Sequence, residues 1–269
     1  MGRFEGRRVL VTGGGSGIGR ATVLRILREG GSVVAADISE AGLKETAALA
    51  EGLADRLHTQ VLDVSDESSV RAGVAAGVTG LGGLDALVNS AGILRSAHTH
   101  ETTLDSWNRT IAVNLTGTFL TTREALPALL AGGKGVVVNF SSTSASFAHP
   151  YMAAYAASKG GIQSFTHAIA LEYAKQGLRA VCVAPGSISS GMTDGSGGAG
   201  QNSGPGLPED TDWELFAKLR PALFGEGYAD ARTGFADAGA VAGVVAMLAS
   251  DDGAFITGTE IRVDGGTHM

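Results

Sequence analysis

Short apolar runs alternate with longer amphipathic stretches along the chain. This alternation is typical of repeated βαβ units, in which each helix connects two parallel strands. The apolar runs predict strands at Arg8–Thr12, Ser32–Asp37, His58–Asp63, Ala86–Asn89, Gly135–Phe140, Ala180–Ala184 and Glu260–Val263. The amphipathic stretches predict helices at Gly17–Glu29, Glu40–Glu51, Glu67–Val78, Leu104–Leu130, Ala153–Lys175 and Ala236–Ala249.

The predicted strands indicate a parallel sheet. Val136-Val137-Val138 is apolar at every position, which is typical of a strand covered on both faces. We therefore expect a doubly wound α/β fold, flanked by helices on both faces, whose ligands bind at the carboxyl ends of the strands. The 269 residues suffice for one large domain spanning residues 1–269, and two small domains are the alternative.

One segment interrupts this rhythm. Residues 191–206, GMTDGSGGAGQNSGPG, have no apolar periodicity, and we expect them to be mobile. Thr211-Asp-Trp-Glu214 has the form of a capping box, which predicts a short helix with Trp213, Phe216 and Leu219 on one face. A mobile stretch before an apolar helix suggests a substrate lid at about residues 190–230. A surface insertion without function is the alternative.

Composition narrows the class of protein. The net charge of -7 and the pI near 5.3 give no overall attraction to nucleic acid or to an anionic membrane. Cys182 is the only cysteine, so an internal disulfide is impossible, and its neighbours Val181 and Val183 indicate a buried thiol. The N-terminus has no apolar signal core and no 18 apolar residues run together, so we expect a soluble cytoplasmic protein.

A glycine-rich turn follows the first predicted strand. Val9-Leu10-Val11 leads into TGGGSGIG, which places Gly13, Gly17 and Gly19 in the spacing G-x-x-x-G-x-G around Ser16 and Ile18. The strict dinucleotide fingerprint G-x-G-x-x-G is absent here. Glycines still let a strand turn sharply into a helix, whose first amides can hold a pyrophosphate. A tight connection without a ligand is the alternative.

An acidic residue ends the second predicted strand. Asp37 can accept hydrogen bonds from both ribose hydroxyls of an adenosine and would repel a 2′-phosphate. It is followed by Ile38, and Ser16 lies in the glycine turn, so neither place offers a cation to a phosphate. The pattern therefore favours NAD over NADP, with a helix N-cap as the alternative role of Asp37. Asp63-Val64, after the third strand, suits the adenine edge.

Tyr155 and Lys159 lie four residues apart in Tyr-Ala-Ala-Ser-Lys, within a predicted helix. Residues at this spacing share one helix face. A nearby cation favours the phenolate, so we expect Lys159 to lower the pKa of Tyr155 from its usual value near ~10. Such a tyrosine can give a proton to a carbonyl oxygen or take one from an alcohol. An ordinary exposed helix face is the alternative.

Several further motifs stand in a fixed order along the chain. They are Asn89-Ser90-Ala91-Gly92, Asn114, Ser142, Pro185-Gly186 and Val263-Asp264-Gly265-Gly266. Together with TGGGSGIG, Asp63-Val64 and Tyr155-x-x-x-Lys159, this set resembles the short-chain dehydrogenase/reductase family over nearly all of the chain. The resemblance implies a Rossmann-type domain with seven parallel strands and hydride transfer between nicotinamide and a secondary alcohol or ketone.

The resemblance also implies roles for individual residues. Tyr155 would be the general acid/base, and Lys159 would hydrogen-bond the nicotinamide ribose. Ser142 would polarise the carbonyl oxygen. Ser141 is its neighbouring competitor, and strand alternation points the two in opposite directions. Asn114 would position a water that links Lys159 to solvent.

The family's cofactor-binding positions map onto matching residues. Asp63, Val64 and Asn89 would bind the adenosine side, next to Ala91 and Gly92. The segment after Pro185-Gly186 would bind the carboxamide, through Ile188 and Ser190. The family more often has threonine where Ser190 stands, and a hydroxyl is preserved. We expect no metal: His98 and His100 have a spacing that suits metal ligands, but no acid or cysteine cluster accompanies them.

The sequence therefore predicts an NAD-dependent oxidoreductase acting on an alcohol/ketone pair of small molecules. One alternative is a 3-oxoacyl-[acyl-carrier-protein] reductase, although its acidic partner would favour a basic docking patch. An alternative of another class is a non-catalytic nucleotide-binding redox sensor, which has no need of the Ser–Tyr–Lys set. The two long helices Leu104–Leu130 and Ala153–Lys175 resemble the family's dimerising pair, so we expect a homotetramer or homodimer.

Overall fold

The computed structural model describes residues 2–194, 206–223, 225, 228–230 and 234–269. Its strands form one seven-stranded sheet in the order β3-β2-β1-β4-β5-β6-β7, and every neighbouring pair is parallel. The strands are β1 (Arg8–Thr12), β2 (Ser32–Asp37), β3 (Leu57–Val61), β4 (Ala86–Asn89), β5 (Val136–Phe140), β6 (Arg179–Pro185) and β7 (Glu260–Val263). The predicted parallel α/β sheet of Rossmann type is confirmed.

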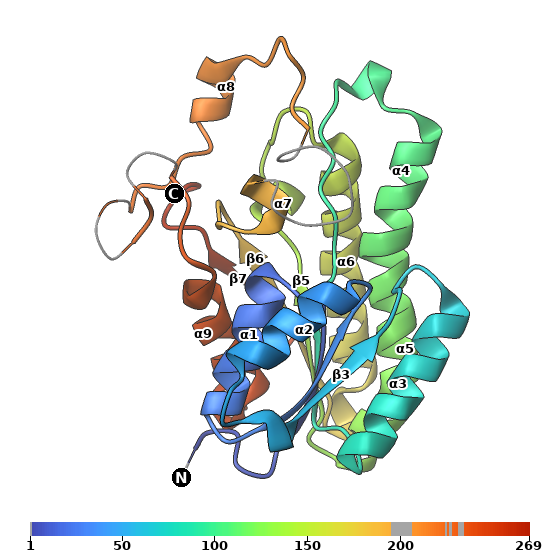
Figure 1. Cartoon of the computed structure of the whole chain (residues 1–269). Helices are drawn as coiled ribbons and strands as arrows, with labels where there is room; N and C mark the ends of the chain where they lie inside the picture. Colours follow the sequence, from blue (N-terminus) through green and yellow to red (C-terminus); the bar gives the residue numbers. More distant parts are fainter. Residues whose placement is uncertain (1, 195–205, 224, 226–227, 231–233) are drawn as a thin grey trace.

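Helices connect the strands and cover both faces of the sheet (Figure 1). The α-helices are α1 (Gly17–Arg28), α2 (Glu40–Leu49), α3 (Glu67–Leu81), α4 (Leu104–Ile111), α5 (Gly117–Ala131), α6 (Ala153–Glu172), α7 (Gly191–Asp194), α8 (Trp213–Ala217) and α9 (Ala238–Ala249). Short 3₁₀ turns are η1 (Ala54–Arg56), η2 (Thr99–Glu101), η4 (Thr143–Ala145), η5 (Ala174–Gln176) and η6 (Asp251–Gly253). Among the described residues, no helix is long and apolar enough to cross a membrane.

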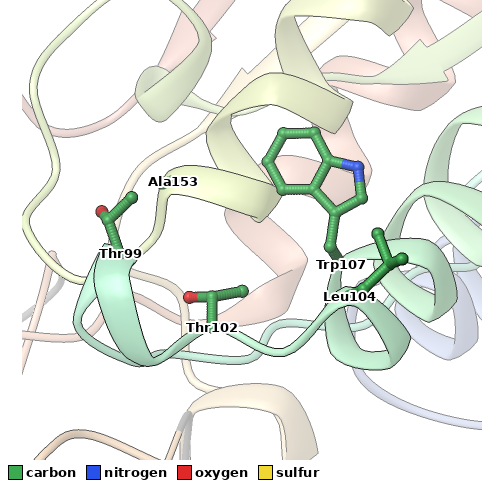
Figure 2. A pocket seen from close by; sticks show the side chains of 5 residues that line it. All are labelled: Thr99, Thr102, Leu104, Trp107 and Ala153. Carbon is green, nitrogen blue, oxygen red and sulfur yellow. The ribbon is translucent and has the colours of Figure 1, made fainter.

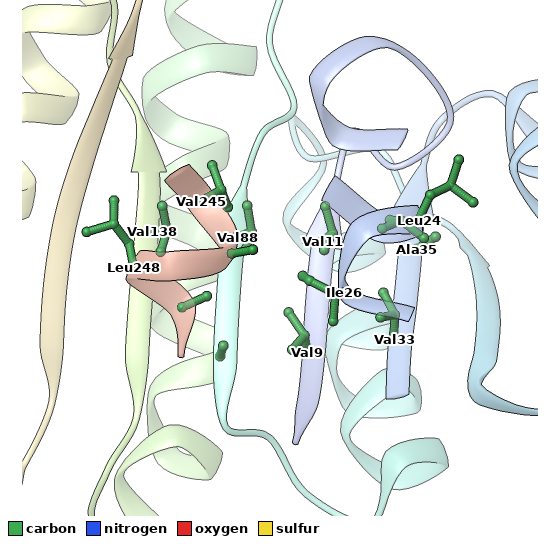
Figure 3. Close-up of a cluster of buried hydrophobic side chains, with 14 of the residues drawn as sticks. Val9, Val11, Leu24, Ile26, Val33, Ala35, Val88, Val138, Val245 and Leu248 are labelled. Atoms are coloured by element: carbon green, nitrogen blue, oxygen red, sulfur yellow. The ribbon is translucent and has the colours of Figure 1, made fainter. Parts of the chain in front are cut away.

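Two buried layers flank the sheet because alternate strand residues point to opposite faces. Val9 and Val11 belong to the layer beneath α1 and α9, whereas Leu10 belongs to the layer beneath α3, α5 and α6. Figure 3 shows the first layer, where Ile26 of α1 and Leu248 of α9 pack on the strands. Burial on both faces explains why the central strands are apolar at successive positions.

Local polar residues and glycines set the helix ends. α3 runs to Leu81, beyond the predicted Val78, because Gly82 takes the left-handed cap conformation with φ 69°. α9 begins at Ala238 rather than Ala236, since the carboxylate of Asp237 accepts a hydrogen bond of 2.7 Å from Gly239 N.

The predicted helix Leu104–Leu130 has an irregular centre. Residues Ala112–Thr116 form a π-helical turn (η3) between α4 and α5. The segment is therefore helical throughout, but its central turn is wider than an α-helical turn. Such turns are rare and frequently occur at functional sites.

The fold gathers the predicted site residues at one edge. The sheet changes direction between β1 and β4, which lie side by side although β2 and β3 separate them in sequence. A doubly wound sheet binds its ligands outside the carboxyl ends of the strands at such a switch point.

Candidate active site

Ser142 and Tyr155 face each other above the end of β5. Ser142 lies two residues beyond the strand and Tyr155 lies in the first turn of α6. The side chains are hydrogen-bonded, and Ser142 Oγ also accepts a bond of 3.2 Å from Ser144 N. Ser141 points elsewhere, because its hydroxyl donates to the carbonyl oxygen of Lys159 at 3.3 Å. The two serine hydroxyls therefore have different partners, and Ser142 is the one that meets Tyr155.

Lys159 is anchored to the backbone of β5. Only 4% of its surface is exposed, and its Nζ donates a 2.7 Å hydrogen bond to the carbonyl oxygen of Phe140. The same Nζ lies 5.5 Å from the centre of the Tyr155 ring. Burial lowers the pKa of Lys159 to about 8, and Cys182 opposes this shift slightly.

The expectation that Lys159 lowers the pKa of Tyr155 is wrong for the chain by itself. Burial raises the pKa of Tyr155 to about 12, and the Ser142 hydrogen bond opposes that rise. The ammonium is turned toward Phe140 and lies over the ring, so desolvation of the phenolate dominates. Tyr155 is therefore a protonated phenol at neutral pH.

Asn114 lies inside the π-helical turn, where its side chain joins two other segments. Its Oδ1 accepts from Ile93 N at 2.8 Å, and its Nδ2 donates to Ile93 O and to Ser158 Oγ, each at 3.0 Å. A Cβ added to Gly92 would lie 3.3 Å from Asn114 Oδ1 and 3.7 Å from Lys159 Nζ. Asn114 therefore lies close to Lys159, but the described contacts include no direct hydrogen bond between these two side chains.

The glycine turn between β1 and α1 packs closely against its neighbours. Gly13 has φ 70°, and a Cβ there would lie 2.8 Å from Ala91 N. Gly19 packs so closely on Gly13 that a Cβ would lie 2.0 Å from the Gly13 carbonyl oxygen. Ser16, the N-cap of α1, makes no side-chain cap, and the first turn of α1 holds no acidic residue. The first amides of α1 and its positive dipole end therefore fit a pyrophosphate.

Asp37 stands beside this turn with both carboxylate oxygens hydrogen-bonded. Oδ2 accepts from Gly15 N and Oδ1 accepts from Ser39 N, each at 2.9 Å. The N-cap of α2 is Ser39, whose hydroxyl accepts from Gly42 N at 3.0 Å, so Asp37 is not the helix cap. Each Asp37 oxygen retains a lone pair, which fits two ribose hydroxyls. The side chain of Ile38 is exposed.

The other adenosine-side residues are held by local bonds. Asp63 Oδ1 accepts from Ser65 N at 2.8 Å and from Ser65 Oγ at 2.6 Å. Val64 is buried against Gly117, and a Cβ added to Gly117 would lie 2.9 Å from the Cβ of Val64. Asn89 Nδ2 donates to Thr122 and Asn139, and Asn89 Oδ1 accepts from Thr121. The side-chain amide of Asn89 is thereby occupied inside the protein.

The end of β6 lies beside the start of α1. A Cβ added to Gly17 would lie 3.1 Å from Ser190 Cβ, which brings the residues after Pro185 to the glycine turn. Gly186 packs on Asp264, and Ile188 is buried in the same layer as Ile18. The glycine turn and the segment 185–190 therefore lie next to each other.

The predicted short helix exists, but its cap is a different residue. Asp212 caps α8 by accepting from Leu215 N at 2.9 Å, whereas Thr211 Oγ1 donates to Pro208 O at 2.6 Å. Trp213 is exposed and Leu219 is buried, so the predicted shared face is divided between solvent and protein. Residues 195–205, which carry most of the predicted mobile segment, lie outside the described residues.

Among the described residues, no group of three or more His, Cys, Asp or Glu side chains gathers as a metal site would. His98 instead meets Asp210, with Nε2 2.9 Å from Oδ1. A cavity of about 280 Å³ lies nearby between η2, α4 and the start of α6 (Figure 2). It is lined by Thr99, Thr102, Leu104, Trp107 and Ala153, and includes none of the predicted catalytic residues.

Three features of the site were not expected from the sequence. Ser158 holds the Asn114 amide, and the Phe140 carbonyl holds Lys159. Tyr151 adopts φ 66° and is the one non-glycine residue with positive φ in the described part of the chain. Ser158 lies next to Lys159 in the Tyr-x-x-x-Lys motif, so its position could have indicated a role. No local sequence pattern indicates the Phe140 contact or the φ of Tyr151.

Comparison with known proteins agrees with this geometry. The family model for short chain dehydrogenases matches residues 7–198. A 3-oxoacyl-[acyl-carrier-protein] reductase of Thermotoga maritima is 35% identical over 264 residues, covering 98% of each chain. Levodione reductase of Leifsonia aquatica is 34% identical over 267 residues, covering 98% of this chain and 95% of the relative. The crystal structure of carveol dehydrogenase from Mycobacterium avium in complex with NAD superposes with a TM-score of 0.84 at 29% identity, covering 99% of each chain.

The fold and site define an oxidoreductase of the nicotinamide-dependent type that acts on CH–OH donors. The chain belongs to the short-chain dehydrogenase/reductase family.

Proposed function

We propose that this protein is an NAD-dependent oxidoreductase that transfers a hydride between nicotinamide and a secondary alcohol or ketone. The observation that carries the proposal is the buried contact between Ser142 and Tyr155, beside a Lys159 fixed to the Phe140 carbonyl. This cluster lies at the carboxyl ends of the strands, next to an α1 N-terminus without a side-chain cap.

The chain's own residues would handle the oxygen of the substrate. In the reducing direction, a nicotinamide cofactor held in the site would supply the hydride for the carbonyl carbon. Tyr155 then gives its proton to the carbonyl oxygen, because its raised pKa keeps the phenol protonated at neutral pH. The Ser142 hydroxyl stabilises the charge that develops on the same oxygen.

Lys159 and Asn114 would support this proton transfer. When the cofactor is bound, the Lys159 ammonium would hydrogen-bond the nicotinamide ribose and bring positive charge closer to the phenol oxygen. Asn114, held by Ile93 and Ser158, would place a water between Lys159 and solvent, so that Tyr155 can regain its proton.

The choice of NAD follows from the ribose end of the crevice. The carboxylate of Asp37 would repel a 2′-phosphate. The nearest cation in that turn is Arg20, and its guanidinium is held by Glu45 at 2.7 Å, by Thr46 at 3.0 Å and by the Gly15 carbonyl. Nothing there offers an unpaired cation to a phosphate among the described residues.

A spectrophotometric screen tests the proposal. NAD+ reduction would be followed over alcohols, hydroxysteroids, polyols and hydroxyacyl thioesters, and the screen would be repeated with NADP+. We expect turnover of at least one secondary alcohol with NAD+ preferred. Binding of NAD without turnover of any substrate would instead support a nucleotide-binding redox sensor.

A second candidate rests on the relative from Thermotoga maritima, which is named as a 3-oxoacyl-[acyl-carrier-protein] reductase. If this chain had that activity, an acyl thioester would be reduced with NADPH in preference to NADH. The net charge of -7 disfavours an acidic carrier protein as the partner.

We further propose that the chain acts as one domain with a substrate lid near residues 190–230, and that it works in the cytoplasm as a homotetramer or homodimer. Apolar side chains of α4, α5 and α6, including Leu104, Phe119 and Leu171, are exposed in the single chain. Such a surface is typical of a subunit interface. Light scattering after gel filtration would give the mass of the assembly, and a mass near 27.1 kDa would contradict it.

A further inference from the structure

A described segment spans the edge of the sheet at which the reacting groups lie. This strap, residues 208–223, contains α8, which Figure 1 shows on the same side of the sheet as α7. One end of the strap is attached beyond β7: Leu223 N donates to Gly265 O at 2.8 Å. Leu219 O accepts from Ser187 Oγ, just beyond β6, at 3.4 Å.

The other end of the strap is attached on the opposite side of the crevice. Asp212 N donates to the hydroxyl oxygen of Tyr151 at 2.9 Å. Tyr151 lies two residues before α6, and Tyr155 is in the first turn of that helix. Asp210 Oδ1 lies 2.9 Å from His98 Nε2 in the segment that follows β4. The strap therefore passes over the space between β4 and β7, where Ser142 and Tyr155 lie.

Tyr151 connects its own segment to the strap and to residues 97–98, through separate atoms. Its hydroxyl oxygen binds the strap, and its carbonyl oxygen accepts from Ala97 N at 2.9 Å. Its ring meets the His98 ring edge-on, with centroids 5.2 Å apart. Tyr151 makes these contacts with φ 66°, a conformation that disfavours residues with a side chain. Strain of this kind persists when surrounding contacts hold it, and it concentrates at functional sites.

We propose that Tyr151 is a positioning residue that holds the strap over the substrate crevice, with the His98–Asp210 contact as a second attachment. The proposal rests on the function assigned to Tyr155 above. Substrate affinity then depends on Tyr151, although Tyr151 takes no part in proton transfer. The attached strap encloses the substrate, so its release weakens substrate binding. Cofactor binding is unchanged by this release.

The second attachment responds to pH. The groups that face His98 are Asp210 of the strap, the Tyr151 ring, and His100 and Glu101 of its own segment. The nearby Asp212 carboxylate is directed instead to Leu215 N. The hydrogen bond from Asp210 raises the pKa of His98 above its ordinary 6.5. The ion pair is therefore complete below that raised pKa and weakens as the pH rises through it.

Kinetics of Tyr151→Phe test the first attachment, because this change removes the hydroxyl and keeps the ring. We expect KM for the substrate to rise roughly five- to tenfold while kcat stays within about twofold, as loss of one hydrogen bond would give. The dissociation constant for NADH should stay unchanged. The matched control is Tyr173→Phe, at the far end of α6, which should alter neither constant.

His98→Gln tests the second attachment. Glutamine can still hydrogen-bond Asp210 but does not titrate, so the rise of KM as the pH passes the raised pKa of His98 should flatten. His100→Gln, at an exposed neighbouring position, should keep the wild-type profile. An unchanged pH profile in His98→Gln would overturn this part of the proposal.

Limited trypsin digestion tests the strap without relying on catalysis. Lys218 is exposed within the strap, and the following Arg220–Pro221 bond resists trypsin, so cleavage after Lys218 reports on this segment. We expect Tyr151→Phe to be cut there several-fold faster than wild type or Tyr173→Phe. An equal rate together with an unchanged KM would overturn the proposal, even if Tyr155 acts as proposed. Loss of the role of Tyr155 would not change the digestion result.

Discussion

The ammonium of Lys159 donates a 2.7 Å hydrogen bond to the carbonyl oxygen of Phe140, while its neighbour Tyr155 bonds to Ser142. The two members of the Tyr-x-x-x-Lys motif therefore have different partners in the chain by itself. Burial raises the pKa of Tyr155 to about 12 and lowers that of Lys159 to about 8. Both shifts favour the neutral form of the group, as desolvation requires.

These shifts predict different pH profiles for the two reaction directions. Ketone reduction needs the protonated phenol, which is present throughout the neutral range, so kcat/KM for reduction should stay flat there. Alcohol oxidation needs the ionised phenol, so its kcat/KM should rise with pH, by up to about tenfold per unit below the effective pKa. Initial rates in both directions between about pH 6 and 10 would check this. An oxidation rate that falls as the pH rises would contradict it.

Asp37 should decide between NAD and NADP. In Asp37→Ser the repulsion of a 2′-phosphate is lost along with the acceptors for the ribose hydroxyls. We expect the ratio of kcat/KM for NAD+ over NADP+ to fall by about 100-fold, which corresponds to ~2.7 kcal/mol. Steady-state kinetics with both cofactors would measure it, with the exposed Asp55→Ser as the control. A ratio unchanged in Asp37→Ser would mean that another group selects the cofactor.

Ser142 and Ser141 should differ sharply in their effect on turnover. Ser142→Ala removes the hydroxyl that meets Tyr155, so kcat should fall by about 100- to 1,000-fold, as for loss of one donor to a developing oxyanion. Ser141→Ala removes only a long 3.3 Å bond to the Lys159 carbonyl and should leave kcat within about fivefold. Equal losses in the two variants would show that the hydroxyls act through structure alone.

The fold was predictable because burial on both faces makes the central strands apolar at successive positions. β1 illustrates this, because Val9 and Val11 pack into one buried layer and Leu10 packs into the other. Strand alternation also predicted that Ser141 and Ser142 point in opposite directions, whereas the choice of Ser142 came from the family resemblance. Both features depend on local periodicity, which a sequence displays directly.

Other features depend on contacts between distant segments. The hydrogen bond from Lys159 to Phe140 joins residues 19 positions apart, and helical spacing alone directed the ammonium to Tyr155. The φ of Tyr151 depends on its bonds to Ala97 and Asp212. Thr211 and Asp212 are both able to cap a helix, and the turn with Pro208 decides which of them does so.

The buried amide pair beneath the site should matter for stability. Asn139 is fully buried, where its Oδ1 accepts from Asn89 at 2.8 Å and its Nδ2 donates to Thr166 at 2.8 Å. Asn139→Ala removes one hydrogen bond from each partner inside the core and leaves a cavity, so it should reduce the free energy of unfolding by about 2–4 kcal/mol. Urea unfolding followed by circular dichroism would measure the change, with the exposed Asn108→Ala as control. A change as small as that of the control would contradict the network's importance.

Tyr155→Phe is the most direct test of the central claim, that one phenol transfers the proton. The variant keeps the ring beside Lys159 and removes only the hydroxyl bonded to Ser142. The measurement is kcat for the best alcohol substrate with NAD+, together with the dissociation constant for NADH. The account predicts that kcat falls by at least about 100-fold while NADH binds as in the wild type. Turnover at the wild-type rate would contradict it.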